Sequence, residues 1–192
     1  MQEVYKLDKY RLEQAARLII EGIGENPKRQ GLIETPQRFA KMLMEQLEYA
    51  DVSNEEIAKK FDKCFDSGDN NMVVVKDITV FSHCEHHIAL MYDMSVSVGY
   101  IPKGRVIGLS KVARIAEAVC KRLQIQERIG TDIIDILKKI LGTDDIIVLI
   151  EGKHSCMTAR GINKPNSVTR TVTCSGCFFK HSPKAEFLAA IK

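Results

Sequence analysis

Two hydrophobic periodicities divide the chain. Up to about residue 60, apolar residues recur every three or four positions, the spacing that places them on one face of an amphipathic helix. This spacing, together with residues that cap helices, predicts three helices. They are expected over residues 9–22 after Asp8 as N-cap, from Thr35 as N-cap with Pro36 in the first turn, and from Ser53, with Glu56 at capping-box spacing. We expect residues 1–70 to form an N-terminal helical arm.

From residue 72 onward the helical spacing gives way to segments rich in β-branched residues, with clear alternation over residues 91–101 and 167–174, which predicts strands. Four strands are expected, over residues 72–81, 91–101, 146–151 and 167–174. Between the second and third strands the helical period returns twice, in a helix capped by Ser110 and in one that begins near Gln126 and ends at Gly142. The order β-β-α-α-β-β predicts an α+β fold over residues 71–192, with an antiparallel sheet and both helices on one face.

The expected sheet has two open edges. An open strand edge presents unpaired backbone groups, and proteins usually cover it or pair it with another chain. We therefore expect a homo-oligomer.

Composition and charge exclude several classes of protein. The net charge of +3 on 192 residues, without a basic tail, argues against nucleic-acid binding. No stretch approaches the length of apolar sequence that spans a membrane. The N-terminal residues lack an apolar run preceded by positive charge, so we expect a cytoplasmic protein. Its six cysteines are then reduced thiols or metal ligands rather than a disulfide framework.

Two short segments carry the residues that bind metals. Residues 81–88 and 154–156 hold four of the five histidines of the chain and two of the six cysteines. Cys84 and His87 are three positions apart, so a tight turn can direct both side chains at one point. Cysteine and histidine in tetrahedral geometry are typical zinc ligands. His154 and Cys156 are two apart, so both project from one face if that segment is extended.

The spacing leaves three interpretations open. In the first, Cys84, His87 and Cys156 hold a catalytic zinc with an open position for water, and His86 and His154 flank it as acid–base groups. The second is a closed structural zinc held by four protein ligands, Cys84 and His87 with Cys174 and Cys177. The third is that the histidines only form hydrogen bonds in the core. The spacing favours the first interpretation.

A second group of residues could bind an anion. Ser110, Lys111 and Arg114 stand at the start of a predicted helix, where free N–H groups and basic side chains attract anions. Arg160 follows the second metal segment. By themselves these residues are more typical of a solvated basic face, and Glu127 after Gln126 is more typical of a partner for the helix dipole.

Taken together, these motifs resemble one family, GTP cyclohydrolase I. The matching pieces run in order through almost the whole chain. They are Glu25-Asn-Pro27, Gly31-Leu32, Thr35 to Met42, Cys84-Glu-His-His87, Gly99-Tyr-Ile-Pro102, Gly108-Leu-Ser-Lys111 with Arg114-Ile115, Leu123 to Arg128, His154-Ser-Cys-Met157 with Arg160-Gly161, and Asn166-Ser167.

The resemblance implies a fold, a reaction and an assembly. The fold is the tunnelling fold, in pentameric barrels paired as a homodecamer with sites at subunit interfaces. The reaction hydrolyses GTP at C8, releases formate and forms 7,8-dihydroneopterin triphosphate, the first step of tetrahydrofolate (pterin) biosynthesis. One Zn²⁺ per subunit is implied.

The resemblance also implies a role for each site residue. Cys84, His87 and Cys156 match the zinc ligands, and His86 and His154 the acid–base groups. Gln126 and Glu127 match the guanine-binding positions. Ser110, Lys111, Arg114 and Arg160 match the triphosphate binders, joined by Arg38 and Lys41 from a neighbouring chain.

Two alternatives belong to other classes. Tunnelling-fold relatives with different chemistry, such as the nitrile reductases, would lack the paired Cys-Glu-His-His and His-x-Cys segments, which are present here. A zinc-stabilised assembly protein would have a fourth protein ligand. Cys174 and Cys177 depart from the family pattern, since no ligand is expected there, and we take them as strand residues.

Overall fold

The structure is a computed structural model that describes residues 6–192 and divides into two compact units. The first extends to Asp51 and the second runs from Val52 to Lys192. The functional boundary expected near residue 70 stays a prediction.

The first unit is a pair of packed helices, α1 (Lys9–Gly22) and α2 (Thr35–Gln46). The side chain of Asp8 accepts a hydrogen bond from the backbone N–H of Arg11 at 3.1 Å, which confirms it as the cap of α1. Thr35 was wrong as the cap of α2. It is already helical, Glu34 precedes it, and no side chain caps this helix.

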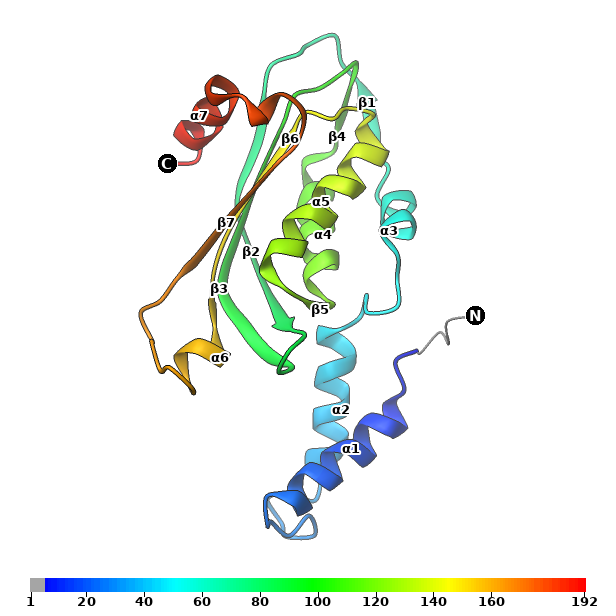
Figure 1. The fold of residues 1–192 in the computed structure, drawn as a ribbon. Coiled ribbons are helices and arrows are strands. Elements are labelled where there is room, and N and C mark those ends of the chain that lie inside the picture. The colour runs from blue at the N-terminus through cyan, green and yellow to red at the C-terminus, as the bar shows by residue number, and fades with distance from the viewer. Residues whose placement is uncertain (1–5) are drawn as a thin grey trace. The chain divides into compact units, whose positions relative to one another are not determined.

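The second unit is built on a five-stranded sheet in the order β5-β2-β3-β6-β7 (Figure 1). All neighbours are antiparallel except β5 and β2. The strands are β2 (Val73–Cys84), β3 (Ala89–Tyr100), β5 (Leu123–Gln124), β6 (Ile146–His154) and β7 (Thr169–Cys174). A separate two-stranded sheet pairs β1 (Cys64–Asp66) with β4 (Arg105–Ile107). The four long strands and their pairing confirm the predicted α+β fold, which is consistent with the tunnelling fold.

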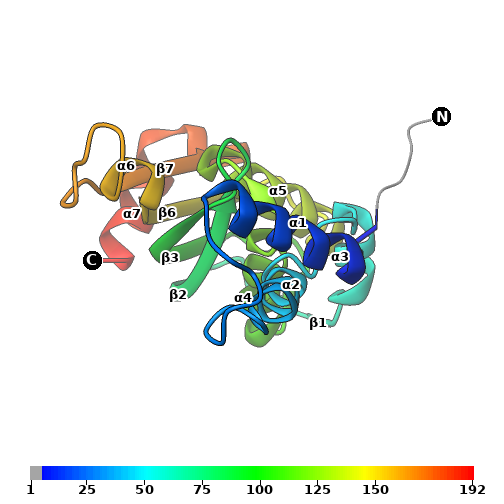
Figure 2. The ribbon, with the colours of Figure 1, turned by 90° about the horizontal axis from the view of Figure 1, so that it is seen from below.

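Two long helices cover one face of the sheet, as predicted. They are α4 (Leu109–Cys120) and α5 (Gln126–Leu141), and α3 (Asn54–Lys60) packs on α5. The isoleucines and leucines of α5 that face the sheet are fully buried, and Gly142 ends the helix in the left-handed conformation at φ 67°. In Figure 2 these helices lie on one side of the strands and α7 (His181–Ala190) lies on the other. There Phe187 packs with Phe178, Ile147 and Leu149 in a second apolar cluster.

Sequence patterns misplaced or missed three features. Ser110 does not cap α4, because Gly108 holds the N-cap position and Ser110 lies inside the helix. The strand β5 has only two residues, too short to show any periodicity, yet it pairs in parallel with His83 and Cys84. The pairing of β1 with β4 joins segments about forty residues apart and carries no local signal.

The two ends of the sheet carry different elements. The β2–β3 turn, β5, the start of α5 and the short helix α6 (Ser155–Thr158) lie at one end, and β4 with the start of α4 lies at the other (Figure 1). Within residues 6–192, no helix combines the length and apolar character needed to cross a membrane.

Candidate metal centre

Cys84, His87 and Cys156 come together at the β2–β3 end of the sheet. One ligand atom from each lies within 4.8 Å of the others, and the Cys84 Sγ is 3.8 Å from the His87 Nδ1. Cys84 is the last residue of β2, His87 lies in the turn that follows, and Cys156 lies in α6. The structure therefore unites the three residues that the sequence predicted as metal ligands.

The turn that carries Cys84 and His87 is held from outside by an ion pair. Glu85 accepts a hydrogen bond from the Arg128 guanidinium of α5 at 2.5 Å, and its backbone N–H donates to the carbonyl of Gln124 in β5 at 3.0 Å. The Arg128 hydrogen bond holds the pKa of the Glu85 carboxyl below its usual range. Ile88, which closes the turn, has φ 49°, a strained conformation for a β-branched residue. These contacts bond the turn to α5 and β5.

The donor atoms suit a divalent metal of zinc type. Burial and the neighbouring Cys84 thiol raise the pKa of the Cys156 thiol, because two thiolates this close repel one another. A bound cation would remove that repulsion. Two thiolates and one imidazole form a known three-ligand set that leaves a fourth position open. The residues present therefore fit a metal.

His154 lies beside this group at the end of β6. Its Nε2 is 2.9 Å from the Oε1 of Gln126, the first residue of α5. Burial lowers the pKa of His154, and the charge of Glu127 acts in the opposite direction. His86 is exposed on the turn, with its ring centroid 6.3 Å from that of His87.

The approach of His154 and Cys156 differs from the geometry expected from their spacing. The segment is not extended throughout, because β6 ends at His154 and Cys156 lies in the turn of α6. A helical turn after the strand, rather than a shared strand face, brings Cys156 to Cys84.

The other cysteines lie outside the metal group. Cys174 ends β7, and Cys177 lies in the 3₁₀ helix η1 (Gly176–Phe179), where its N–H donates to the Asp145 carboxylate at 2.6 Å. Within residues 6–192, the only clustered set of metal-ligating side chains is Cys84, His87 and Cys156. The geometry thus favours an open site over the closed one.

The residues expected to bind phosphate belong to different elements of the chain. Arg160 follows α6 and its charge acts on the Cys156 thiol. Ser110, Lys111 and Arg114 lie in the first half of α4, whose far end leads into β5 beside Cys84. Arg38 and Lys41 lie on α2 in the first unit, and both are exposed.

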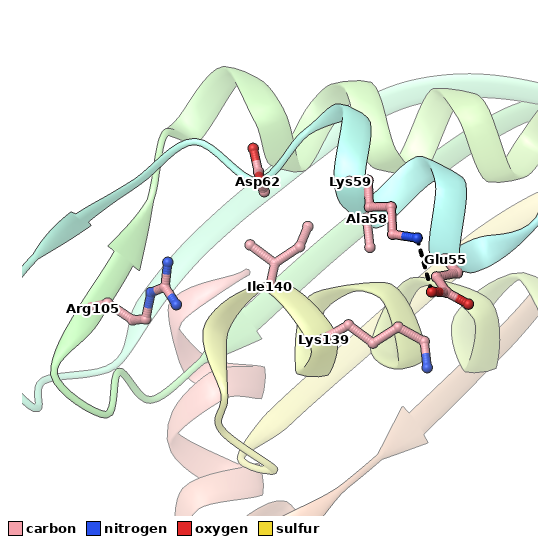
Figure 3. Close-up of a pocket in the computed structure, with 7 residues that line it drawn as sticks. All are labelled: Glu55, Ala58, Lys59, Asp62, Arg105, Lys139 and Ile140. Atoms are coloured by element: carbon pink, nitrogen blue, oxygen red, sulfur yellow. Dashed lines mark ion pairs between the residues drawn. The ribbon is translucent and has the colours of Figure 1, made fainter.

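A cavity of about 550 Å³ lies away from the metal group, lined from α3, β4 and the end of α5 (Figure 3). Its basic lining residues include Lys59, paired with Glu55 at 3.0 Å, and Lys139, paired with Asp135 at 3.2 Å. None of its seven lining residues is a cysteine or histidine. We assign it no part in the chemistry of the metal group.

Sequence reasoning missed Arg128, which supports the metal turn through Glu85. Arg128 lies forty-three residues from Glu85, and a half-buried arginine on a helix gives no signal of such a contact. The sequence also indicated only a substrate contact for Gln126, although this residue is 1% exposed.

The fold and the site together define an α+β protein of tunnelling-fold type with a candidate Cys₂His metal centre. The chain belongs to the GTP cyclohydrolase I family, whose model matches residues 12–192. It is 51% identical over 178 residues to GTP cyclohydrolase 1 of Clostridium botulinum (strain Loch Maree / Type A3), covering 90% of this chain and 91% of that one. It is 50% identical over 177 residues to GTP cyclohydrolase 1 of Clostridium acetobutylicum, with the same coverage. It is similarly 50% identical over 179 residues to that of Clostridium beijerinckii.

Proposed function

We propose that this chain is a zinc-dependent GTP cyclohydrolase I. It hydrolyses GTP at C8, releases formate and forms 7,8-dihydroneopterin triphosphate, the first step of pterin synthesis for tetrahydrofolate. The observation that carries the proposal is the convergence of Cys84, His87 and Cys156 at one end of the sheet, in a chain of this family.

The three ligands would hold one zinc per subunit and leave one coordination position open. Bound zinc would supply the Lewis acid that makes water nucleophilic enough to attack C8. The chain supplies the proton transfers. His154 and His86 flank the metal group, and imidazoles exchange protons near neutral pH, as ring opening and the later rearrangement require.

Substrate recognition would come from both ends of the nucleotide. The Glu127 carboxylate can accept two N–H donors, which matches the edge of guanine. The triphosphate needs cations and helix N–H groups, and remote binding of this kind holds the reacting ring in place. The proposed triphosphate binders are Ser110, Lys111, Arg114, Arg160, Arg38 and Lys41.

The placement of α4 supports an oligomer with sites at subunit interfaces. The helix runs from its basic start near β4 to β5, which pairs with Cys84. At about 1.5 Å per residue, its twelve residues separate the two ends by about 18 Å. The start of α4 is therefore poorly placed to reach the metal group of its own chain, and a neighbouring chain would supply it. The edge strand β7 could pair between chains, and we propose a decamer of two pentamers.

The decisive experiment incubates zinc-loaded protein with GTP, oxidises the products and measures pterin fluorescence and formate. We expect stoichiometric formate and pterin, lost on removal of zinc and restored by adding it back. Protein that holds one zinc per subunit and yields no pterin would overturn the proposal.

A second experiment separates metal binding from proton transfer. His154→Ala should retain one zinc per subunit and lose turnover by about 10²-fold or more, because it removes an acid–base group and no ligand. Loss of zinc in this variant would show that His154 is a ligand.

A further inference from the structure

The amide of Gln126 is held in one orientation. The side chain is buried, and its Nε2 donates to the carbonyls of Ile150 in β6 at 3.2 Å and Thr169 in β7 at 3.1 Å, with the Thr171 hydroxyl oxygen at 3.4 Å. Carbonyl oxygens only accept hydrogen bonds, so the NH₂ end of the amide must face them. The Oε1 end is thereby fixed on the opposite side.

The fixed Oε1 faces His154. It lies 2.9 Å from the Nε2 of that ring. An amide oxygen only accepts, so the Nε2 of His154 must carry the hydrogen of this bond. The interaction sets the rotation of the ring and leaves Nδ1 as the nitrogen that Gln126 does not engage.

The elements around the amide are closely packed. A Cβ at Gly152, in β6, would lie 2.8 Å from the Met94 Cγ, so glycine provides the room for Met94. The same Cβ would lie 3.5 Å from the Gln126 Oε1, an ordinary contact distance, so β6 borders the amide directly. A Cβ at Gly130, one turn further along α5, would lie 2.3 Å from the Thr173 Oγ1 of β7. The start of α5 is therefore packed closely on both strands that bind the amide.

We propose that Gln126 is a positioning residue, whose amide orients His154 for proton transfer rather than binding guanine. The inference rests on the proposed function, and it assigns different roles to the neighbouring residues Gln126 and Glu127. Gln126 is 1% exposed and both ends of its amide are engaged, whereas Glu127 is exposed and remains available to the substrate.

The test is a double-mutant cycle with Gln126→Met and His154→Ala in zinc-loaded protein, with kcat, KM for GTP and melting temperature measured for each. Methionine keeps the length of the side chain and removes its polar atoms. We expect Gln126→Met to lower kcat by about tenfold to a hundredfold, part of what an acid–base group contributes, with KM nearly unchanged. In the His154→Ala background, the same change should lower kcat no further, because the residue acts through that histidine.

A matched control separates positioning from stability. Ile147→Val weakens the apolar cluster under α7, seven residues from His154 along β6, or about 23 Å at the rise of a strand. It should lower the melting temperature and leave kcat unchanged.

Three results would overturn the inference. A raised KM with unchanged kcat in Gln126→Met would make Gln126 a guanine contact. Losses that multiply in the double variant would show that it acts independently of His154, and a lowered melting temperature with wild-type kcat would leave it a purely structural role. Failure of the proposed function is distinct, because then the unmodified protein yields no pterin.

Discussion

The buried pair of Arg122 and Asp132 provides a sharp prediction about what holds the site end of the sheet together. Their side chains are only 13% and 17% exposed, and the Arg122 Nη1 lies 3.4 Å from the Asp132 Oδ2. Asp132 also accepts from Gln124 at 3.0 Å and Asn54 at 3.1 Å, so one carboxylate of α5 joins β5 and α3. Removing this carboxylate in Asp132→Ala tests the cluster.

The expected loss of unfolding free energy in Asp132→Ala follows from the unpaired guanidinium of Arg122 that the substitution leaves behind. Burial lowers the pKa of Arg122 and the charge of Asp132 counteracts that shift, so the guanidinium depends on its counterion. Breaking a buried pair from one side costs about 3–5 kcal/mol. Because both side chains keep some exposure, we expect about 3 kcal/mol for Asp132→Ala, the low end of that range. Arg122→Met removes the guanidinium charge together with its hydrogen bonds to Val52 and Asn54. We expect it to lower the free energy of unfolding by about 2 kcal/mol.

The assay is urea unfolding followed by circular dichroism at one fixed protein concentration, since assembly shifts apparent stability. The double variant should cost less than the sum of the single changes by about 1–2 kcal/mol, because it leaves no unpaired charge. The control is Glu55→Ala, which breaks an exposed pair with Lys59 and should cost less than about 0.5 kcal/mol. Equal losses for Asp132→Ala and Glu55→Ala would refute the reasoning.

Further predictions concern individual side chains. Cys156→Ser should lower zinc stoichiometry well below one per subunit by metal analysis without unfolding the protein, because it removes one of three ligands; full zinc content would exclude Cys156 as a ligand. The Cys120 thiol should resist iodoacetamide at pH 8 until urea is added, since burial raises its pKa to about 12; labelling of the folded protein would contradict this. Gly130→Val should lower the melting temperature by several degrees, because even a Cβ there would lie 2.3 Å from the Thr173 hydroxyl oxygen. Glu85 has a lowered folded pKa, so the stability from its ion pair is fully present above the unfolded pKa of about 4.3 and is lost as pH falls through the lower folded pKa. Between pH 5 and pH 3, Glu85→Gln should therefore lose less stability than the unmodified chain does, and parallel curves would contradict this.

Periodicity predicted the long elements of this fold and failed at the short ones. Alternation of apolar and polar residues marks the strands that became β3 and β7, and β-branched residues mark β2. An unbroken apolar run marks β6, whose first five residues are all buried, and the burial of α5 repeats at helical spacing. Two-residue β5 and three-residue β1 are too short to alternate. They exist because tertiary packing brings their backbone groups to a partner strand, and a short stretch of sequence carries no information about that partner.

The candidate metal group of Cys84, His87 and Cys156 could be predicted because cysteine and histidine at close spacing are chemically specific. The contacts that support the site could not be predicted. Glu85 with Arg128 and Gln126 with His154 use residue types that are common on any surface, and their partners come from distant segments. The direction of an amide depends on which carbonyls lie behind it, and only the packed sheet defines those.

Because of the length of α4, the metal content and the turnover of this protein should respond differently to dilution. The three candidate metal ligands, Cys84, His87 and Cys156, belong to one chain, so zinc retention should be insensitive to dilution. The basic start of α4 lies a helix length from the strand beside Cys84, so turnover in the proposed assembly would need a neighbour. Diluted protein would then hold its full complement of metal and be inactive. Metal content would therefore be a poor measure of active enzyme, and specific activity is meaningful only alongside a measured subunit concentration.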